Sequence, residues 1–304
     1  WSQRIAPHRD EIAVDGLWGP GGQDSEWKPL KQVLLHRPGD ELSASHNDPD
    51  KVQMLAPIDV ERAAVEHDAM AQAFRDEGVT VHYVDPARPA NPNQMFCADL
   101  MFMTPEGVIL ARPASTVRAG EEIEVQRRLA DLRIPVVRTL RGQATFEGAD
   151  AMWLDPRTVI LGIGHRTNEE AVHQIAQTLE EMEVETIPVD MPFGTMHLMG
   201  MLRFADEDLA LCWPRRTPHG AVVALRERGY EVAFLPDLDN HTLNRGMNFV
   251  TVGPRRILME AGYAEVQSFY ESLGIACVTV AAEELVKAAG GFGCLTGIVE
   301  REMG

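Results

Sequence analysis

Residues able to combine nucleophilic and acid–base chemistry recur along this chain at intervals of about fifty residues. Asp99, the pair Glu147 and Asp150, His197 and Cys294 each stand at the start of a segment that reads as strand, tight turn, strand. A thiolate is the attacking form of cysteine, and a nearby histidine supplies a base or a positive field. Two carboxylates suit a cationic substrate through charge-assisted hydrogen bonds. The set indicates attack by a thiolate on the planar carbon of a guanidinium.

Each of these residues, taken alone, also has an ordinary structural interpretation. A single cysteine is more often a small buried hydrophobe than a nucleophile, and a carboxylate near a turn is usually a cap or a turn former. Their recurrence at equivalent positions favours the chemical interpretation. Glycines on both sides of Cys294, in the sequence GGFGCLTG, would let the backbone approach a ligand closely.

The elements that must position these residues form a repeat. Hairpins are predicted over 98–113, 149–164, 198–214 and 247–262, with turns near Pro105, Pro156, Glu207 and Pro254. The helices predicted after these hairpins span 121–133, 167–182, 218–229 and 264–274, and closing strands are predicted over 134–140, 184–189, 230–235 and 275–280. The repeating unit is therefore ββαβ.

The two ends of the chain complete a fifth unit. A strand over 31–37, a helix over 60–78 and a strand over 79–84 lack one hairpin strand, which 294–300 can supply. We therefore predict one domain over 1–304, a pseudo-five-fold α/β propeller closed by both termini, with few exposed sheet edges. The alternative is an ordinary α/β protein with one open sheet, whose crossover helices would link parallel strands without repeated hairpins.

Composition limits the partners and the compartment. The net charge of −18 argues against nucleic acid and against an anionic membrane surface. No stretch approaches the roughly 18 apolar residues of a membrane span, and the first residues lack the apolar region of a secretory signal. The four cysteines have no C-x-x-C spacing, which disfavours structural zinc and fits a reducing cytosol. We expect a cytoplasmic protein, with homo-oligomer formation left open.

These motifs resemble the guanidine-modifying superfamily, which comprises arginine deiminases, dimethylarginine dimethylaminohydrolases and amidinotransferases. The resemblance runs from LKQVLLHRPGDEL (30–42) to CLTGIVER (294–301). It implies the family's pentein fold, a five-fold α/β propeller, and a reaction on a small guanidino substrate without metal or cofactor.

The resemblance also implies roles for single residues. In PNQMFCAD (92–99), Asn93 would hold the amino-acid end of the substrate and Asp99 would bind guanidine nitrogens. In FEGAD (146–150), Glu147 would be the carboxylate beside the guanidine and the histidine, and Asp150 is expected to bind substrate with it.

His197 matches the catalytic histidine of the family and Cys294 its nucleophile. Arg118 and Arg166 match two arginines that grip the substrate carboxylate. The alternative for either arginine is a salt bridge at the surface or between modules.

Two positions depart from the family pattern. Met199 replaces the aspartate of the usual His-x-Asp, which disfavours plain arginine and suits a guanidine with one alkylated face. Phe292-Gly293 stands where relatives often carry His or Arg before the cysteine.

We therefore expect a hydrolase that converts a substituted arginine, such as an N-methylated arginine, to a citrulline-like product and an amine through an S-alkylthiouronium. The alternatives are an arginine deiminase or related dihydrolase, an amidinotransferase, and a guanidine-binding propeller without activity.

Overall fold

All four predicted hairpins are present in the computed structural model, which describes residues 1, 3–14 and 16–303. They are β3 (Met101–Thr104) with β4 (Gly107–Leu110), β6 (Ala151–Asp155) with β7 (Thr158–Ile163), β9 (Leu202–Asp206) with β10 (Leu209–Cys212), and β12 (Val250–Gly253) with β13 (Arg256–Glu260). The turns fall where Pro105, Pro156, Glu207 and Pro254 predict them, because proline and acidic residues favour tight turns.

Each hairpin is followed by a helix and a parallel third strand. The helices are α4 (Glu121–Asp131), α5 (Glu169–Glu180), α6 (His219–Glu227) and α8 (Ala264–Ser272), and the third strands are β5 (Val136–Thr139), β8 (Glu185–Asp190), β11 (Glu231–Phe234) and β14 (Ala276–Val280). In every one of these sheets the second hairpin strand lies in the centre, antiparallel to the first strand and parallel to the third. The ββαβ unit is confirmed.

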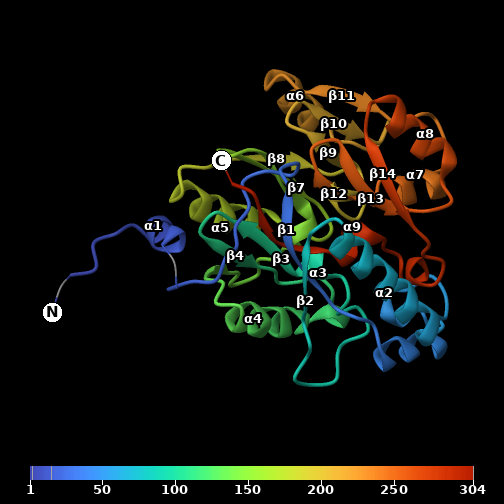
Figure 1. Cartoon of the computed structure of the whole chain (residues 1–304), viewed down its shortest axis with the longest axis horizontal. Coiled ribbons are helices and arrows are strands. Elements are labelled where there is room, and N and C mark those ends of the chain that lie inside the picture. The colour runs from blue at the N-terminus through green and yellow to red at the C-terminus, as the bar shows by residue number, and fades with distance from the viewer. Residues whose placement is uncertain (2, 15, 304) are drawn as a thin grey trace.

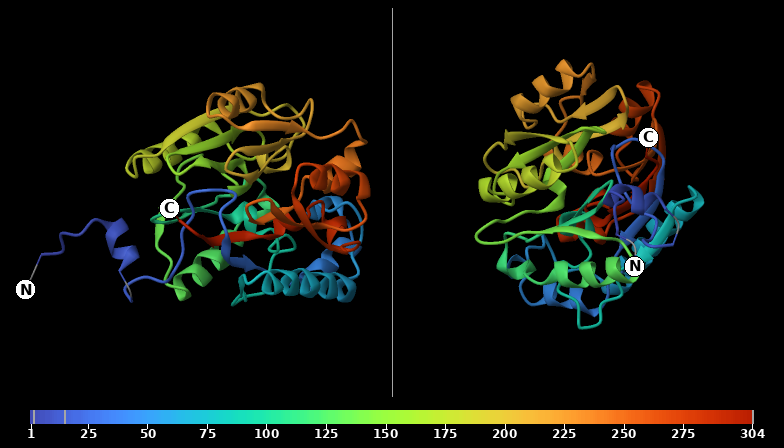
Figure 2. Two further views of the ribbon diagram at one scale, coloured as in Figure 1. Left: turned by 45° about the horizontal axis from the view of Figure 1, so that its top comes forward. Right: turned by 90° about the vertical axis from the view of Figure 1, so that its left-hand side faces the viewer.

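The fifth sheet joins the two ends of the described chain. Strand β15 (Gly297–Arg301) pairs antiparallel with β1 (Leu30–Leu35), and β1 pairs parallel with β2 (Thr80–Tyr83) after the helix α2 (Val60–Asp76). Neighbouring sheets contact one another along the ring. Strand β15 contacts β3, β6 contacts the turn before β9, and β12 contacts β1. The five sheets thus follow one another around the molecule and form the α/β propeller that the repeat predicts (Figures 1 and 2).

The helices that join the hairpins to the third strands, together with α2, lie outside the ring and cover apolar clusters. Helix α5 illustrates why: its buried residues are Ala171, Val172, Ile175, Thr178 and Leu179, which share one helical face. The side chain of Asn168 caps this helix by accepting from the Ala171 backbone N–H. The cluster beneath α5 also contains Phe102 and Trp153 from two neighbouring sheets, so burial of this helix joins adjacent modules.

A short helical turn precedes each inner strand, and the sequence did not predict it. These turns include α3 (Cys97–Leu100), η4 (Gly148–Asp150), η5 (Leu198–Gly200) and α9 (Phe292–Leu295), while α7 (Asn240–Gly246) precedes β12. The prediction of a strand over 294–300 was therefore wrong at its start, because Cys294 lies in α9 and the strand begins at Gly297. A single turn is too short to display helical periodicity in a sequence.

The remaining elements lie outside this repeat. Helix α1 (His8–Ala13) lies at the edge of the molecule beside the N-terminus, where His8 Nε2 is 3.1 Å from the Glu106 carbonyl oxygen (Figures 1 and 2). The short 3-10 helices are η1 (Asp40–His46), η2 (Asp50–Val52), η3 (Thr116–Arg118) and η6 (Leu285–Ala288). Among the described residues, none of the helices has the length and apolar character that crossing a membrane requires.

Candidate active site

The helical turns before the inner strands bring the predicted site residues to the same end of the ring. A cavity of about 40 Å³ is lined by Asp99, His197 and Cys294. A second cavity of about 260 Å³ also contacts His197 and Cys294. The two cavities therefore adjoin at the residues expected to act on the substrate. The other predicted residues lining the smaller cavity are Asn93, Arg118 and Arg166.

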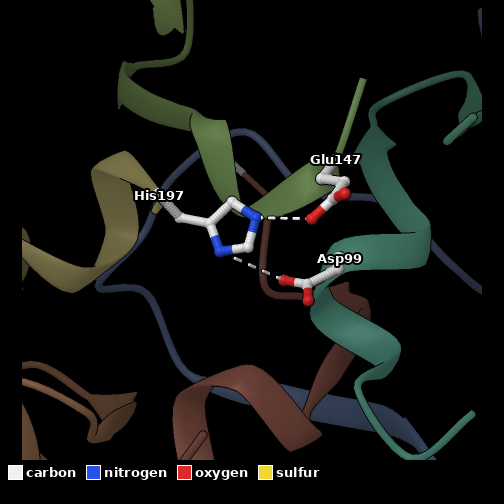
Figure 3. A group of neighbouring side chains, drawn as sticks. All are labelled: Asp99, Glu147 and His197. Carbon is white, nitrogen blue, oxygen red and sulfur yellow. Dashed lines mark hydrogen bonds and ion pairs between the residues drawn. The ribbon is translucent and has the colours of Figure 1, made fainter. Parts of the chain in front are cut away.

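His197 lies between two carboxylates that come from two other modules (Figure 3). Its Nε2 is 2.6 Å from Oε2 of Glu147, and its Nδ1 is 3.7 Å from Oδ1 of Asp99. Burial opposes the charged imidazole, but Asp99 and Glu147 outweigh it and raise the pKa of His197 to about 9. His197 is therefore an imidazolium at neutral pH and has a proton to give.

Glu147 is fully buried and receives four donors. Besides His197, Arg166 Nη1 lies 3.2 Å from Oε1 and Arg118 Nη1 lies 3.5 Å from Oε2, while the Ala114 backbone N–H donates to Oε1. Burial raises the pKa of a carboxyl, but these cations lower the pKa of Glu147 to about 2. The carboxylate stays charged at any pH at which the protein would work.

Arg118 is enclosed by carboxylates. Its Nη1 donates to Asp99 Oδ2 at 2.7 Å, and its Nε donates to Glu121 Oε2 at 3.0 Å on the opposite side. The side chain is only 4% exposed and its guanidinium lies over the ring of Phe96. Arg118 therefore links Asp99 to Glu121.

Asp150 was expected to bind substrate. It lines neither cavity, and both of its oxygens have protein partners. Oδ2 accepts from the Thr167 hydroxyl at 2.7 Å, and Oδ1 accepts from the backbone N–H of Leu198 at 3.0 Å. Because Leu198 directly follows His197, the hydrogen bond from the Leu198 backbone to Asp150 helps to position the histidine.

Cys294 is held by Asn248, from the loop between α7 and β12. The Asn248 amide nitrogen lies 3.2 Å from Sγ, and its amide oxygen accepts from the Cys294 backbone N–H at 3.1 Å. Burial and the nearby charge of Asp99 raise the pKa of the Cys294 thiol, while Asn248 and Arg203 act in the opposite direction. Asn248 stands at the start of the fourth module, at a position equivalent to the predicted site residues that open the other four modules. This equivalence is the sequence signal that could have predicted its contact with Cys294.

The glycines before Cys294 make room for the groups around it. A Cβ on Gly293 would lie 1.8 Å from Nη2 of Arg203, and one on Gly291 would lie 2.9 Å from Cγ of Asn248. Arg203 belongs to β9 and is 8% exposed, so it brings a buried positive charge against the turn that carries the thiol. A cation from another module thus stands beside the cysteine, although the residues preceding it in the chain carry no charge. Nothing in the sequence near Arg203 indicated this position.

Asp99, Glu147 and His197 also have the donor types of a metal site, with one ligand atom from each within 4.8 Å of the others. Each already has a protein partner, however: Arg118 bonds Asp99, and Arg166 and His197 bond Glu147. A metal ion here would have to displace these partners from the ligand atoms.

Comparison with known proteins agrees with the fold. Residues 43–212 match the model of the family described as eukaryotic N,N-dimethylarginine dimethylhydrolase. The dimethylarginine dimethylaminohydrolase of Streptomyces coelicolor is 25% identical over 271 residues, covering 88% of this chain and 96% of the relative. An uncharacterised protein of Bacillus subtilis, YkgA, is 26% identical over 273 residues, covering 90% of this chain and 92% of its own.

Solved structures share the architecture. The dimethylarginine dimethylaminohydrolase of Pseudomonas aeruginosa, solved as a variant complexed with citrulline, superposes with a TM-score of 0.73 at 20% identity, covering 90% of this chain and all of that one. An inosamine-phosphate amidinotransferase of Streptomyces griseus superposes with a TM-score of 0.75 at 14% identity, covering 94% and 98%.

The fold and the site together define a member of the guanidine-modifying pentein superfamily. Within it, the chain belongs to the dimethylarginine dimethylaminohydrolase family, whose members are hydrolases of amidine C–N bonds.

Proposed function

We propose that the protein hydrolyses a substituted guanidine on an arginine-like amino acid, with an N-methylated arginine as the reference substrate. The products would be a citrulline-like ureido compound and an amine. The observation that most supports this is the convergence of Cys294, His197 and Asp99 around the smaller cavity, with the buried carboxylate of Glu147 bonded to His197 behind it.

Binding would exchange one cation for another. The substrate guanidinium would lie against Asp99 and Glu147, replacing the single contact that Arg166 makes with Glu147 at 3.2 Å. Arg166 would then be free to bind the substrate carboxylate together with Arg118. Asn93 uses its amide nitrogen on the Val52 carbonyl, 2.8 Å away, and would offer its amide oxygen to the ammonium group.

The first chemical step would be attack by sulfur on the guanidine carbon. Because the positive substrate offsets the charge of Asp99, it would lower the pKa of the Cys294 thiol and release its proton to solvent. The thiolate forms the S–C bond. Nε2 of His197 is bonded to Glu147, so Nδ1–H would protonate the departing nitrogen as the C–N bond breaks. An S-alkylthiouronium and a neutral imidazole remain.

The second step would use the same histidine in reverse. Neutral His197 takes a proton from a water molecule whose oxygen adds to the thiouronium carbon. The C–S bond then breaks and the hydroxyl on the former thiouronium carbon gives its proton to solvent, which leaves the Cys294 thiolate, the imidazolium and the ureido product. Asp99 and Glu147 would stabilise the positive charge in both tetrahedral states.

Two alternative enzymes differ in their products. An arginine deiminase or dihydrolase would release ammonia from arginine itself, and an amidinotransferase would pass the amidino group to an amine. Met199 lines the larger cavity, so the wall next to His197 carries a thioether where a carboxylate would grip the unsubstituted guanidinium of arginine. This observation favours a substituted guanidine.

The deciding experiment incubates the purified protein with arginine, Nω-methylarginine, asymmetric dimethylarginine, agmatine and guanidino acids. Ureido product and released amine are then measured. We expect equal amounts of citrulline and methylamine from Nω-methylarginine, and no turnover by Cys294→Ser. Cys277→Ser is the matched control, because Cys277 is half-buried in β14 and lines neither cavity. Full turnover by Cys294→Ser would rule out the mechanism, and guanidination of an added amine would favour the transferase.

A further inference from the structure

The larger cavity lies beyond the reacting groups, on the side away from the carboxylates. It has a volume of about 260 Å³ and shares Met196, His197, Ala289 and Cys294 with the smaller cavity. A group leaving the guanidine carbon must pass His197, which gives it a proton in the proposed reaction. The larger cavity is therefore placed to receive the substituent on the departing nitrogen, and a methyl group would fill little of it.

The charged groups around this cavity are positive. Arg203 and Arg216 line it together with the amides of Asn244 and Asn248, and none of the described residues lining it is Asp or Glu. This is unusual in a chain with a net charge of −18, where a random patch of surface would carry carboxylates. The field inside the cavity therefore favours an anion.

Arg216 is held where it can meet that anion. It follows β10, is half-buried, and has its guanidinium carbon 4.4 Å from the centre of the Trp213 ring. Stacking on an aromatic face keeps the donors of a guanidinium at its rim available. Over the part of the chain that the structure describes, no carboxylate forms a salt bridge with Arg216, whereas its neighbour Arg215 is exposed and bonds Asp237 at 2.7 Å.

The remaining wall fits an alkyl linker. Met199, Met201 and Trp213 supply apolar surface between the reacting groups and Arg216. An aspartate in place of Met199 would add a negative charge to the same wall and repel an anion there. With a thioether at this position, the wall between His197 and Arg216 carries no negative charge that would repel an anion.

From this geometry we propose that the larger cavity is a subsite for a carboxylate-bearing substituent on the departing nitrogen. The substrate class would be arginines whose guanidine carries a short alkyl group ending in an acid, and the amine released would be an amino acid. This inference rests on the proposed hydrolase function and adds no chemical step, because the departing nitrogen takes its proton from His197 as before.

The test compares three synthetic substrates: Nω-methylarginine, Nω-carboxymethylarginine and its uncharged analogue Nω-carbamoylmethylarginine. Citrulline release gives kcat/KM for each. Hydrogen bonds to a charged group contribute about 1.5–3 kcal/mol, so we expect the carboxylate to be preferred over the carbamoyl compound by about 10- to 100-fold. The ratio within one protein cancels any difference in the amount of folded enzyme.

Variants then locate the preference. Arg216→Gln should bring the carboxymethyl-to-carbamoylmethyl ratio close to one, and Met199→Asp should lower it by repulsion. Arg215→Gln is the matched control, since its exposed ion pair lies outside the cavity, and it should keep the wild-type ratio. A wild-type ratio of one or less, or an unchanged ratio in Arg216→Gln, would overturn the subsite.

Nω-methylarginine separates the two proposals. If it is hydrolysed while the carboxymethyl compound has no advantage over its carbamoyl analogue, the hydrolase function stands and the subsite is wrong. If none of the three compounds yields citrulline, the proposed function is wrong and the subsite falls with it.

Discussion

Asn248 holds both the side chain and the backbone of Cys294. Its amide nitrogen lies 3.2 Å from Sγ and its amide oxygen accepts the backbone N–H at 3.1 Å, across 46 residues of sequence. One side chain therefore fixes the position of the thiol and offers a donor to the thiolate. Asn248 is itself only 7% exposed, so these bonds form where few water molecules can replace them.

We predict that Asn248→Ala slows alkylation of Cys294 by iodoacetamide at pH 7 by about 3- to 10-fold. The variant loses a hydrogen bond to the thiolate, which raises the pKa of the thiol. The alkylation rate should be measured from pH 6 to 10 with peptide mapping of the labelled cysteine. The rate profile of the variant should shift to higher pH. Asn240→Ala, at an exposed position in α7, is the control, and identical profiles for both variants would contradict the prediction.

Arg118 should be essential for stability as well as for binding. Arg118→Met leaves Asp99 and Glu121 buried without their shared cation, and breaking a buried pair in this way costs about 3–5 kcal/mol. Denaturant unfolding gives the free energy of unfolding. Adding Glu121→Gln should recover part of the loss, because one uncompensated charge disappears. The exposed pair of Arg215 with Asp237 offers the comparison: Arg215→Met should cost less than about 1 kcal/mol.

His197 should make stability depend on pH in the alkaline range. Its pKa is raised to about 9 in the folded protein from the ordinary value of 6.5 for a histidine. Its contribution to the free energy of unfolding is therefore complete below about pH 6.5 and is lost as the pH rises through about 9, by on the order of 3 kcal/mol. Unfolding of the wild type and of His197→Gln should be followed from pH 6 to 10.

The difference in free energy of unfolding between the wild type and His197→Gln isolates the contribution of the histidine from those of other groups that titrate in the same range. This difference should shrink toward alkaline pH. His173→Gln, at an exposed position in α5, should run parallel to the wild type. A constant difference between wild type and His197→Gln would show that folding does not raise the pKa of His197.

The sequence predicted the modules well because their signals are local. Alternating apolar residues, turn formers such as Pro105 and Pro156, and the cap Asn168 each act on a few neighbouring residues. The ring then follows from repetition, since a repeat unit can bury its open edge against the next one.

The site was predicted in its residue types and less well in its contacts. A motif identifies Asp150 as an aspartate near the histidine, but it cannot tell that the carboxylate points behind His197 toward the Leu198 N–H. The contact of Arg203 with Gly293 likewise depends on how two distant modules pack, and no local pattern encodes it. Contacts that arise only from packing between modules are those the sequence could not supply.

Gly293 provides the test of that packing. A Cβ there would meet Nη2 of Arg203 at 1.8 Å, so Gly293→Ala must displace the guanidinium that lies beside Cys294. Overpacking of this kind costs about 1–3 kcal/mol, and moving the cation away should raise the pKa of the thiol and slow its alkylation at pH 7. Gly253→Ala in β12 is the matched control, because an added Cβ meets nothing within 4 Å. We expect Gly253→Ala to change the free energy of unfolding by less than about 1 kcal/mol and to leave alkylation unchanged. If the two alanine variants behave alike, Arg203 does not act on the nucleophile, and the thiolate depends on Asn248 and the substrate for its stabilisation.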